Sequence, residues 1–281
     1  MSQIKIYSGF PEAISELTER VRARSTVIHT EKWQGMEIKS RPEAEMRELL
    51  FPAFQVLIPT TDLKILAEQI QPNLPWADQH FETERVCGQP LNPGETWKTW
   101  PWGNSADKFR SEGEQFSHSY AERYWPKYAG VTEKGVLPPT LGDLVPHQGT
   151  RYAYGDLQDV LNLLIAQPFT RQAYIPIFFP EDTGAIHGGR IPCSTGYHLI
   201  LRGGALHIVY QLRSCDFFRH FRDDVYLTVR LLLWFLERLQ NKSPEWETVR
   251  PGVFTMLISS LHLFTNDYRT LFGPSGVYFQ K

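Results

Sequence analysis

The chain has 281 residues, of which 42% are hydrophobic, so it is long enough to bury one large core or two smaller ones. Its 29 basic and 31 acidic residues give a net charge of −2, and this balance excludes recruitment of nucleic acid or of a membrane surface by overall charge. Three cysteines without a secretory signal predict a reduced, cytoplasmic protein. No apolar run reaches the length of a membrane span, and no cysteine or histidine spacing indicates a metal site.

The first third of the chain is predicted to contain helices around one β-rich run. Apolar residues at helical intervals predict an amphipathic helix over residues 12–24. Residues 46–58 are rich in strand-forming side chains. Residues 62–71 are typical of a helix capped by Thr61 or Asp62, and a further helix is predicted from residue 75 to residue 86.

Two loop-rich segments follow. Residues 91–102 are dense in proline, glycine and tryptophan, which predicts an ordered aromatic loop. Trp97 and Trp100 in this loop either close the core or offer a flat wall against which a ring could stack. Residues 104–149 are polar and are predicted to form an insertion, with a short aromatic patch over residues 120–128.

A glycine hairpin places a cysteine beside an arginine. Residues 197–201 and 205–210 are apolar and β-branched or aromatic, and Arg202-Gly203-Gly204 between them predicts a tight turn. Cys193 then begins one strand and Arg213 ends its neighbour. A guanidinium near a thiol favours the nucleophilic thiolate, although a lone cysteine taken by itself is more often inert core.

Further elements are predicted on both sides of this hairpin. Before it, a helix opens at residues 155–159 and a strand covers residues 173–179. After it, residues 224–240 are typical of a long helix and residues 253–259 of a buried strand. His262 is expected just beyond that strand, where a histidine is more often structural than functional.

Four spaced motifs resemble those of the thymidylate synthase superfamily. They are Pro192-Cys193, Gln211-Leu212-Arg213-Ser214-Cys215-Asp216, Phe221-Arg222-Asp223-Asp224 and Ser260-Leu261-His262-Leu263-Phe264. The chain is most similar to the deoxycytidylate (pyrimidine nucleotide) 5-hydroxymethylases, because Asp224 stands where thymidylate synthases have asparagine. The resemblance implies an α/β (α+β) fold with a mixed, largely antiparallel central sheet flanked by helices. It also implies a single domain over residues 1–281, with the insertion around residues 104–149, and a homodimer.

The resemblance implies a role for each motif residue. Cys193 would attack C6 of a pyrimidine nucleoside monophosphate, and 5,10-methylenetetrahydrofolate would supply the one-carbon unit. Arg213 would bind the phosphate and depress the thiol pKa, and Ser214 would add a hydrogen bond to the nucleotide. Asp216 would bind the pterin, and His262 would contact the sugar.

Other site residues are assigned by their position relative to these motifs. Arg41 matches a mobile basic loop that touches the phosphate, although a solvated surface arginine is the simpler reading. Glu82 matches the acidic residue that relays protons, with Glu84 as the alternative. Trp97 and Trp100 are the candidate cofactor wall.

One phosphate-binding motif is incomplete. Arg171 matches an arginine that crosses the dimer interface to the partner's phosphate, but Gln172 stands where relatives have a second arginine. The phosphate site has then either lost one charge or gained Arg190 or Arg151 in its place.

The sequence therefore predicts conversion of dCMP to 5-hydroxymethyl-dCMP through a covalent bond between Cys193 and C6. Asp224 would select cytosine, because a carboxyl group accepts from N4 and, when protonated, donates to N3. Asp223 or Asp224 could instead merely cap the long helix. CMP stays open as substrate, because Phe264 stands where relatives have a tyrosine that bonds the sugar. Methylation of dUMP and a catalytically inactive nucleotide-binding homologue are further alternatives.

Overall fold

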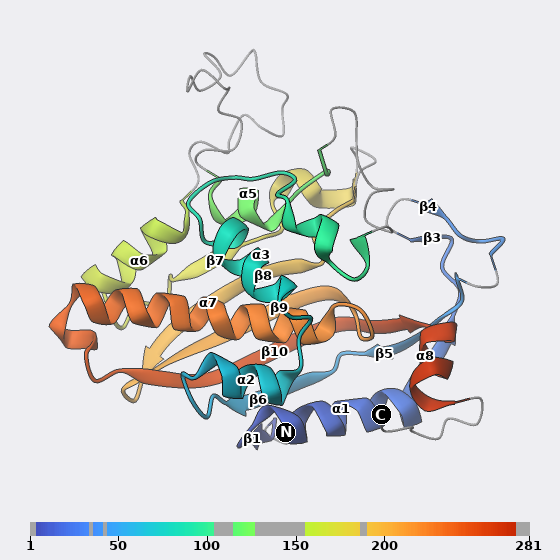
Figure 1. Ribbon diagram of the computed structural model, residues 1–281, viewed down its shortest axis with the longest axis horizontal. Coiled ribbons are helices and arrows are strands. Elements are labelled where there is room, and N and C mark those ends of the chain that lie inside the picture. The colour runs from blue at the N-terminus through green and yellow to red at the C-terminus, as the bar shows by residue number, and fades with distance from the viewer. Residues whose placement is uncertain are drawn as a thin grey trace, which may run out of the picture.

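The structure is a computed structural model that describes residues 4–33, 36–41, 44–103, 115–126, 155–185 and 190–273. An eight-stranded sheet forms its centre (Figure 1). The strands of this sheet are β1 (Ile6–Tyr7), β2 (Thr26–Ile28), β5 (Met46–Leu50), β6 (Ala53–Leu57), β7 (Tyr174–Pro176), β8 (Ser194–Arg202), β9 (Ala205–Asp216) and β10 (Arg250–Phe264). A separate hairpin joins β3 (Lys32–Trp33) to β4 (Met36–Glu37).

The helices are short except for two. They are α1 (Phe10–Arg24), α2 (Leu63–Ile70), α3 (Trp76–His80), α5 (Tyr120–Tyr124), α6 (Leu157–Ala166), α7 (Phe221–Lys242) and α8 (Thr265–Phe272). Single turns complete the set: the π-helix η2 (Phe81–Arg85) and the 3₁₀ turns η3 (Thr96–Thr99), η7 (Pro180–Ala185) and η8 (Pro244–Trp246). No helix of the described residues is long and apolar enough to cross a membrane.

The sheet is mixed. Its order is β1-β6-β10-β9-β8-β7, with β5 following β6 along the same edge of β10 and β2 outside β5. The pairs β1/β6 and β9/β10 are parallel, and the other pairs are antiparallel. The predicted mixed, largely antiparallel sheet is thus confirmed.

Strand β10 lies at the centre and explains why the β-rich run at residues 46–58 is two strands. Its first half pairs with β6 and its second half with β5. The break falls at Phe51 and Pro52, where Phe51 has a φ of 54° and Pro52 has no amide hydrogen for the ladder. Phe51 N still donates to Ser259 O at 2.9 Å, so the two strands follow one edge of β10 with a kink between them.

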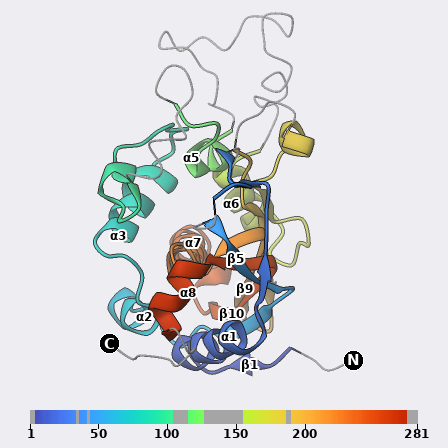
Figure 2. The same ribbon diagram turned by 90° about the vertical axis from the view of Figure 1, so that its right-hand side faces the viewer.

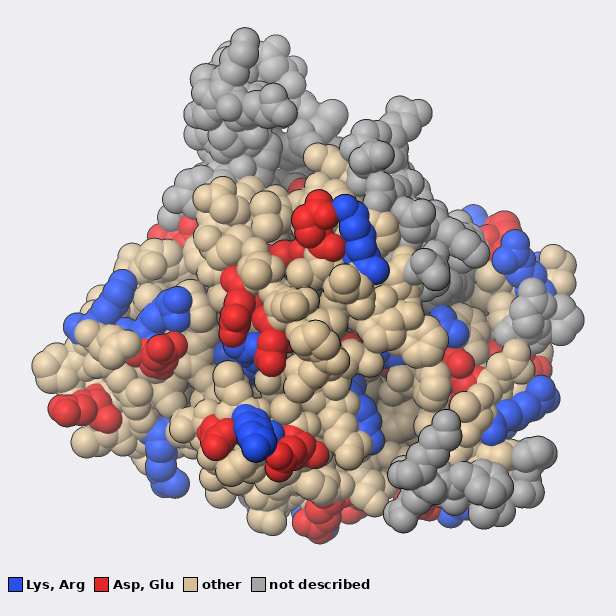
Figure 3. Space-filling model, viewed as in Figure 1, with Lys and Arg blue, Asp and Glu red and all other residues tan. Residues whose placement is uncertain are grey.

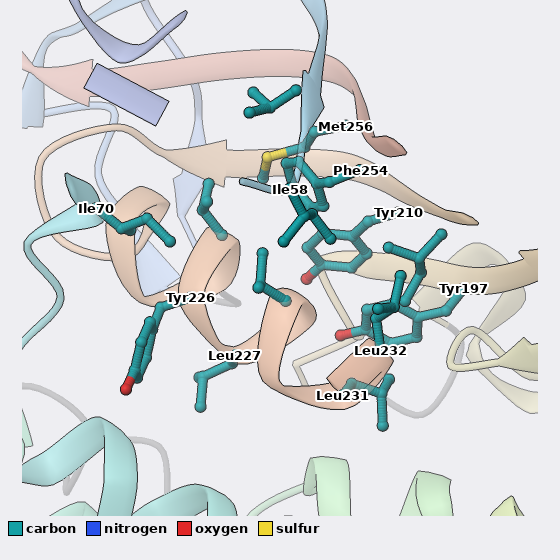
Figure 4. Close-up of a cluster of buried hydrophobic side chains, with 14 of the residues drawn as sticks. Ile58, Ile70, Tyr197, Tyr210, Tyr226, Leu227, Leu231, Leu232, Phe254 and Met256 are labelled. Carbon is teal, nitrogen blue, oxygen red and sulfur yellow. The ribbon is translucent and has the colours of Figure 1, made fainter. Parts of the chain in front are cut away.

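Helix α7 crosses one face of the sheet, with α2 and α3 on the same side (Figures 1 and 2). Leu232 of α7 lies beside Tyr197 and Tyr210 of the strands, whereas Leu227 and Leu231 are buried on the side of α7 that faces away from the sheet (Figure 4). Helix α1 covers this face as well, because the ring of its Phe10 lies 5.9 Å from that of Phe254. The main hydrophobic core therefore lies on this face. Each fully buried large apolar side chain in it stabilises the fold by about 1.5–3 kcal/mol.

The opposite face of the sheet, which we call the open face, carries a continuous cross-strand row. Strand register aligns Ile6, Gln55, Thr255, Val209, His198 and Tyr174 on it. Ile6 is 56% exposed and Tyr174 is 38% exposed at the two ends of this row. The described helices that build the core pack on the other face. The helices expected to flank the sheet therefore lie on one side of it.

The predicted helices α1, α2 and α6 form, and α2 has one of its two expected caps. Helix α1 begins at Phe10, two residues before the predicted start. Asp62 caps α2 by accepting from Lys64 N at 2.8 Å. Asp156 caps α6 in a capping box with Asp159, which satisfies two amides of the first turn.

Several boundaries differ from the predictions. Helix α7 begins at Phe221 rather than at residue 224, so Asp224 lies within its first turn. Strand β10 runs to Phe264, so His262 lies inside the strand and not beyond it. The strand predicted over residues 173–179 is only three residues long. Most of the predicted insertion at residues 104–149, and Arg151, lie outside the described residues.

Candidate active site

The hairpin of β8 and β9 brings Cys193 and Arg213 together. Gly203 and Gly204 close its turn with φ values of 57° and 69°, a conformation that favours glycine. At the open end of the hairpin, Arg213 N donates to Cys193 O at 2.9 Å. The predicted neighbourhood of cysteine and arginine therefore exists in the fold.

The side chain of Arg213 is fixed by backbone carbonyls next to Cys193. Its Nε donates to Pro192 O at 2.8 Å and its Nη2 to Ile191 O at 3.0 Å. Burial nevertheless raises the pKa of the Cys193 thiol, and Arg213 and Arg190 oppose this increase without reversing it. Arg213 thus lowers the pKa of this thiol as expected, but burial raises it by more.

A chain of hydroxyl groups adjoins Cys193. Tyr120 OH lies 2.7 Å from Ser194 Oγ, which also hydrogen-bonds the Tyr210 hydroxyl. The ring of Tyr210 is stacked on Tyr197 with centroids 4.4 Å apart (Figure 4). Burial raises the pKa of Tyr120, and the nearby charges of Asp224 and Cys193 raise it further. The sequence offered only an aromatic patch at residues 120–128 as a signal for Tyr120.

Asp224 closes the other side of this group. The Cys215 thiol donates to its Oδ2 at 3.6 Å. Burial raises the pKa of the Asp224 carboxyl to about 7, the Arg85 charge opposes this rise, and Asp223 adds to it. Burial thus favours the protonated form of this carboxyl more than in an exposed aspartate.

Asp223 has a different task from the helix cap expected of it. It accepts from Asn73 N and from Asn73 Nδ2, both at 2.8 Å, and from Trp100 Nε1 at 3.3 Å. The residue at the N-cap of α7 is His220, and it makes no side-chain cap bond. Asp223 therefore ties the segment before α3 to the start of α7.

Parallel pairing of β9 and β10 brings Ser214, Asp216 and His262 together. Asp216 is in register with His262, and Ser214 Oγ lies 3.4 Å from His262 Nδ1. Burial lowers the pKa of His262 to about 4, so its imidazole is neutral at neutral pH. Asp216 accepts from the amides of Phe218 and Arg219, each at 3.0 Å, while its buried Oδ2 has no hydrogen-bond partner. Burial raises the pKa of Asp216 to about 6.

Trp97 and Trp100, two of the three tryptophans in the aromatic loop, have different surroundings. Trp100 stacks on His220 at 4.6 Å, directly before α7. Trp97 meets Phe116 edge-on at 5.7 Å within the loop region. Only Trp100 is therefore brought to the helix that carries Asp224.

The structure separates the two glutamates proposed as proton relays. The side chain of Glu82 is 65% exposed and binds Arg230 Nη2 at 2.7 Å. It lines a cavity of 560 Å³ between η2 and the outer side of α7, and neither Cys193 nor Asp224 lines that cavity. Glu84 is 6% exposed, accepts from Thr96 N at 2.7 Å and binds His80 at 2.9 Å.

The phosphate candidates are dispersed. Arg41 lies in an exposed turn between β4 and β5. Arg171 is exposed beside β8, where its carbonyl oxygen bonds His198 Nε2 at 3.0 Å. Arg190, one of the two arginines considered as replacements for Gln172, acts on the Cys193 thiol together with Arg213; the other, Arg151, lies outside the described residues.

No group of residues that could hold a metal ion occurs among the described residues. Acidic and basic residues are interspersed over the face of the molecule seen in Figure 3. The residues gathered around Cys193 are two arginines, the Asp224 carboxyl group and tyrosine hydroxyls.

No protein-family model matches the chain, and no curated protein matches it. Among solved structures, the chain is similar to the thermostable thymidylate synthase A from Bacillus subtilis. The TM-score is 0.64, with 11% sequence identity, over 97% of this chain and 86% of that one. At this identity the likeness establishes the fold alone: the chain has a thymidylate synthase-like fold.

Proposed function

We propose that this protein is a folate-dependent transferase that hydroxymethylates C5 of a cytosine nucleotide, converting dCMP to 5-hydroxymethyl-dCMP. One observation carries the proposal. The charges of Arg213 from β9 and of Asp224 from α7 both act on the thiol of Cys193, which directly precedes β8, and Arg213 N donates to Cys193 O at 2.9 Å. These three groups are the ones that covalent activation of a cytosine nucleotide requires.

Cys193 supplies the nucleophile. The C5 carbon of a pyrimidine is unreactive until a nucleophile adds to C6 and interrupts the conjugation of the ring. Arg213 and Arg190 reduce the cost of forming the thiolate, and Arg213 also offers a guanidinium to the nucleotide phosphate. Because burial raises the pKa of this thiol in the free protein, the thiolate would form after the nucleotide has bound.

Asp224 reads the base. Its carboxyl accepts from N4 of cytosine and, in the protonated form that burial favours, donates to N3. Uracil presents O4 and N3–H at these places, so an ionised carboxylate would face an oxygen. An unmatched buried polar contact costs about 1–3 kcal/mol, which favours cytosine by about tenfold to a hundredfold.

The residues present fit a reduced folate. Asp216 Oδ2 is a buried acceptor without a hydrogen-bond partner, which suits the N–H groups of a pterin. Trp100 and His220 form a flat stacked wall at the start of α7. When bound, 5,10-methylenetetrahydrofolate supplies the one-carbon unit that C5 receives, and water completes the hydroxymethyl group.

We further propose that the protein forms a homodimer through the open face of the sheet. The open face carries an apolar end at Ile6, and Tyr174 and half-buried Val209 lie in the same row. Arg171 is fixed through its carbonyl to His198 of that row, so its exposed side chain could reach a partner's phosphate.

Covalent trapping tests the function directly. The protein is incubated with 5-fluoro-dCMP and 5,10-methylenetetrahydrofolate, and its intact mass is measured. A stable adduct of nucleotide and folate is expected, and Cys193→Ala should give none. Absence of an adduct with any 5-fluoropyrimidine nucleotide would favour a non-catalytic binding protein.

Product analysis separates the chemical alternatives. Hydroxymethylation yields tetrahydrofolate, so the absorbance change that marks dihydrofolate should be absent; its appearance would show methyl transfer. Comparing dCMP with CMP decides the sugar, which the Phe264 position leaves open.

A further inference from the structure

Arg85 is a buried cation that the roles assigned above do not use. It ends the π-helix η2 and is 4% exposed. π-Helical turns occur frequently at functional sites, because they reorient the side chains that follow. Here the turn sends two adjacent buried side chains in different directions: Glu84 towards the aromatic loop at Thr96, and Arg85 onto the ring of Tyr120 at 4.2 Å.

Arg85 differs from the other deeply buried arginines of the described chain. Arg123 pairs with Asp182 at 3.0 Å, and Arg230 pairs with Glu82 at 2.7 Å. Within the described residues Arg85 forms no ion pair with a carboxylate. An unpaired buried charge is strongly destabilising, so a chain that retains one has a use for it.

Arg85 is held in place by a hydrogen-bonded chain. Its Nε donates to His80 Nε2 at 3.0 Å, and His80 Nδ1 lies 2.9 Å from Glu84 Oε2. Burial lowers the pKa of His80, which favours the neutral ring that this chain requires, with Nδ1 donating to Glu84. Glu84 thereby orients Arg85 through His80.

The guanidinium lies on the ring of Tyr120, whose hydroxyl is linked through Ser194 Oγ to Tyr210, and the charge of Asp224 acts on both tyrosines. Its positive charge is the largest of the charges acting on that carboxyl, and it also acts on the tyrosines that surround it. The titratable groups that face Asp224 are Arg85 from η2, Asp223 from α7, Tyr210 and Cys215 from β9, Tyr120 from α5 and Cys193 before β8. Arg85 has the largest charge effect on Asp224, the residue proposed to bind the base, whereas Arg213 and Arg190 act on the Cys193 thiol.

We propose that Arg85 is a positioning residue for the covalent step, which stabilises Asp224 as a carboxylate after Asp224 has given its proton to N3 of the base. This inference rests on the proposed function. The Cys193 thiol first loses its proton to water, and the thiolate sulfur bonds to C6. The C5–C6 π pair moves to C4–C5, and the C4–N3 π pair becomes the lone pair on N3 that takes the proton from Asp224. The product is a neutral enamine, nucleophilic at C5, beside an ion pair of Asp224 and Arg85. A fixed cation in a dry site stabilises such a newly formed charge more effectively than water does.

The test follows release of tritium from C5-tritiated dCMP as a function of pH, with dCMP binding measured in parallel. Arg85→Met should slow release about tenfold or more at neutral pH while dCMP binding changes little. The alkaline limb of the pH profile should move up by about one unit, because Asp224 loses its favourable charge partner. Arg85→Lys should restore most of the rate and the position of the limb.

Arg230→Met is the matched control, because it removes an equally buried arginine from the outer side of α7. It should leave the alkaline limb unmoved. If the alkaline limb of the pH profile lay at the same pH in wild type and in Arg85→Met, the proposal would be overturned, even if the variant were slower. Titration of the Asp224 carboxyl by ¹³C NMR in the same proteins should show the same upward shift, and an unshifted titration would also overturn it. If the wild type releases no tritium from any pyrimidine nucleotide, the proposed function fails, while the NMR titration still decides whether Arg85 controls Asp224.

Discussion

Cys193 is half-buried beside two arginines, and under the proposed function its sulfur forms the bond to C6. Cys193→Ala should therefore abolish tritium release from C5 of dCMP. Nucleotide binding should remain measurable by calorimetry, because Arg213 and Asp224 are unchanged. Cys87→Ala is the matched control, since Cys87 is exposed beyond η2, and it should release tritium at the wild-type rate. Normal release by the Cys193 variant would remove this residue from the mechanism.

Asp224 is expected to determine the choice of base. Asp224→Asn should raise turnover of dUMP relative to dCMP by at least about tenfold, because an amide can match both O4 and N3–H of uracil. The ratio is measured in competition with both nucleotides present. An unchanged ratio accompanied by lower thermal stability would leave Asp224 with a structural role at the start of α7.

The same carboxyl should make stability depend on pH. Its pKa is about 7 in the folded protein, whereas an aspartate in an unfolded chain titrates near 4. The folded state binds this proton more tightly, so the stabilisation is complete below about pH 4 and is lost as pH rises through about 7. Asp224→Asn has no such titration, so its Tm relative to wild type should rise from pH 5 to about pH 8. A constant Tm difference across that range would contradict the raised pKa.

Sequence motifs predicted the residues of the hairpin and of the start of α7, but not the residues that surround them. Cys193 and Arg213 could be paired because a two-glycine turn fixes the register of adjacent strands. Tyr120 and Arg85 reach the site through contacts across long stretches of chain, and no local pattern carries that information. Glu82 and Glu84 could not be separated, because a π-turn changes which side chains of a helix point inward.

At the scale of elements, Asp223 links the segment before α3 to the first turn of α7. Asp223→Ala would leave the Asn73 backbone amide and side chain without their acceptor in a buried setting. Hydrogen bonds to a charged acceptor contribute about 1.5–3 kcal/mol each, so the loss in unfolding free energy should be about 3 kcal/mol. Urea unfolding measures it. Asp62→Ala, which removes the exposed cap of α2, is the comparison and should cost about 1 kcal/mol. A loss no larger than that of the comparison would show that this link does not hold the two elements.

Helices were easier to predict than the ends of strands. Caps such as Asp62 and Asp156 are local signals, and they located α2 and α6 correctly. The break between β5 and β6 depends on how both strands meet β10, some 200 residues later in the chain. Strand β10 itself extends past its apolar centre because its neighbours supply ladder partners up to Phe264. Pairing across the sheet, rather than composition, sets these limits.

At the scale of the whole molecule, the open face is expected to mediate dimerisation. Val209→Glu places a charge in the middle of that row and should weaken self-association at least about tenfold, because burying an unpaired carboxylate is costly. Activity should fall with it, since each site would lack its partner's Arg171. Sedimentation over a range of concentrations measures the association. Ile65→Glu on exposed α2 is the control and should sediment as wild type. An unchanged Val209→Glu profile would place the dimer contact elsewhere.

The central position of β10 determines when the protein can fold during synthesis. Every other strand of the described sheet is made before β10, yet β5 and β6 meet β9 only through it. While the ribosome is still translating β10, the nascent chain therefore exposes three separate sets of strands with unpaired edges, namely β1/β6, β2/β5 and β7/β8/β9. Such species are prone to aggregate, and long-range pairing of this kind is slow. Slower translation before β10 should accordingly lower the soluble yield of this protein, whereas chaperones that shield nascent chains should raise it.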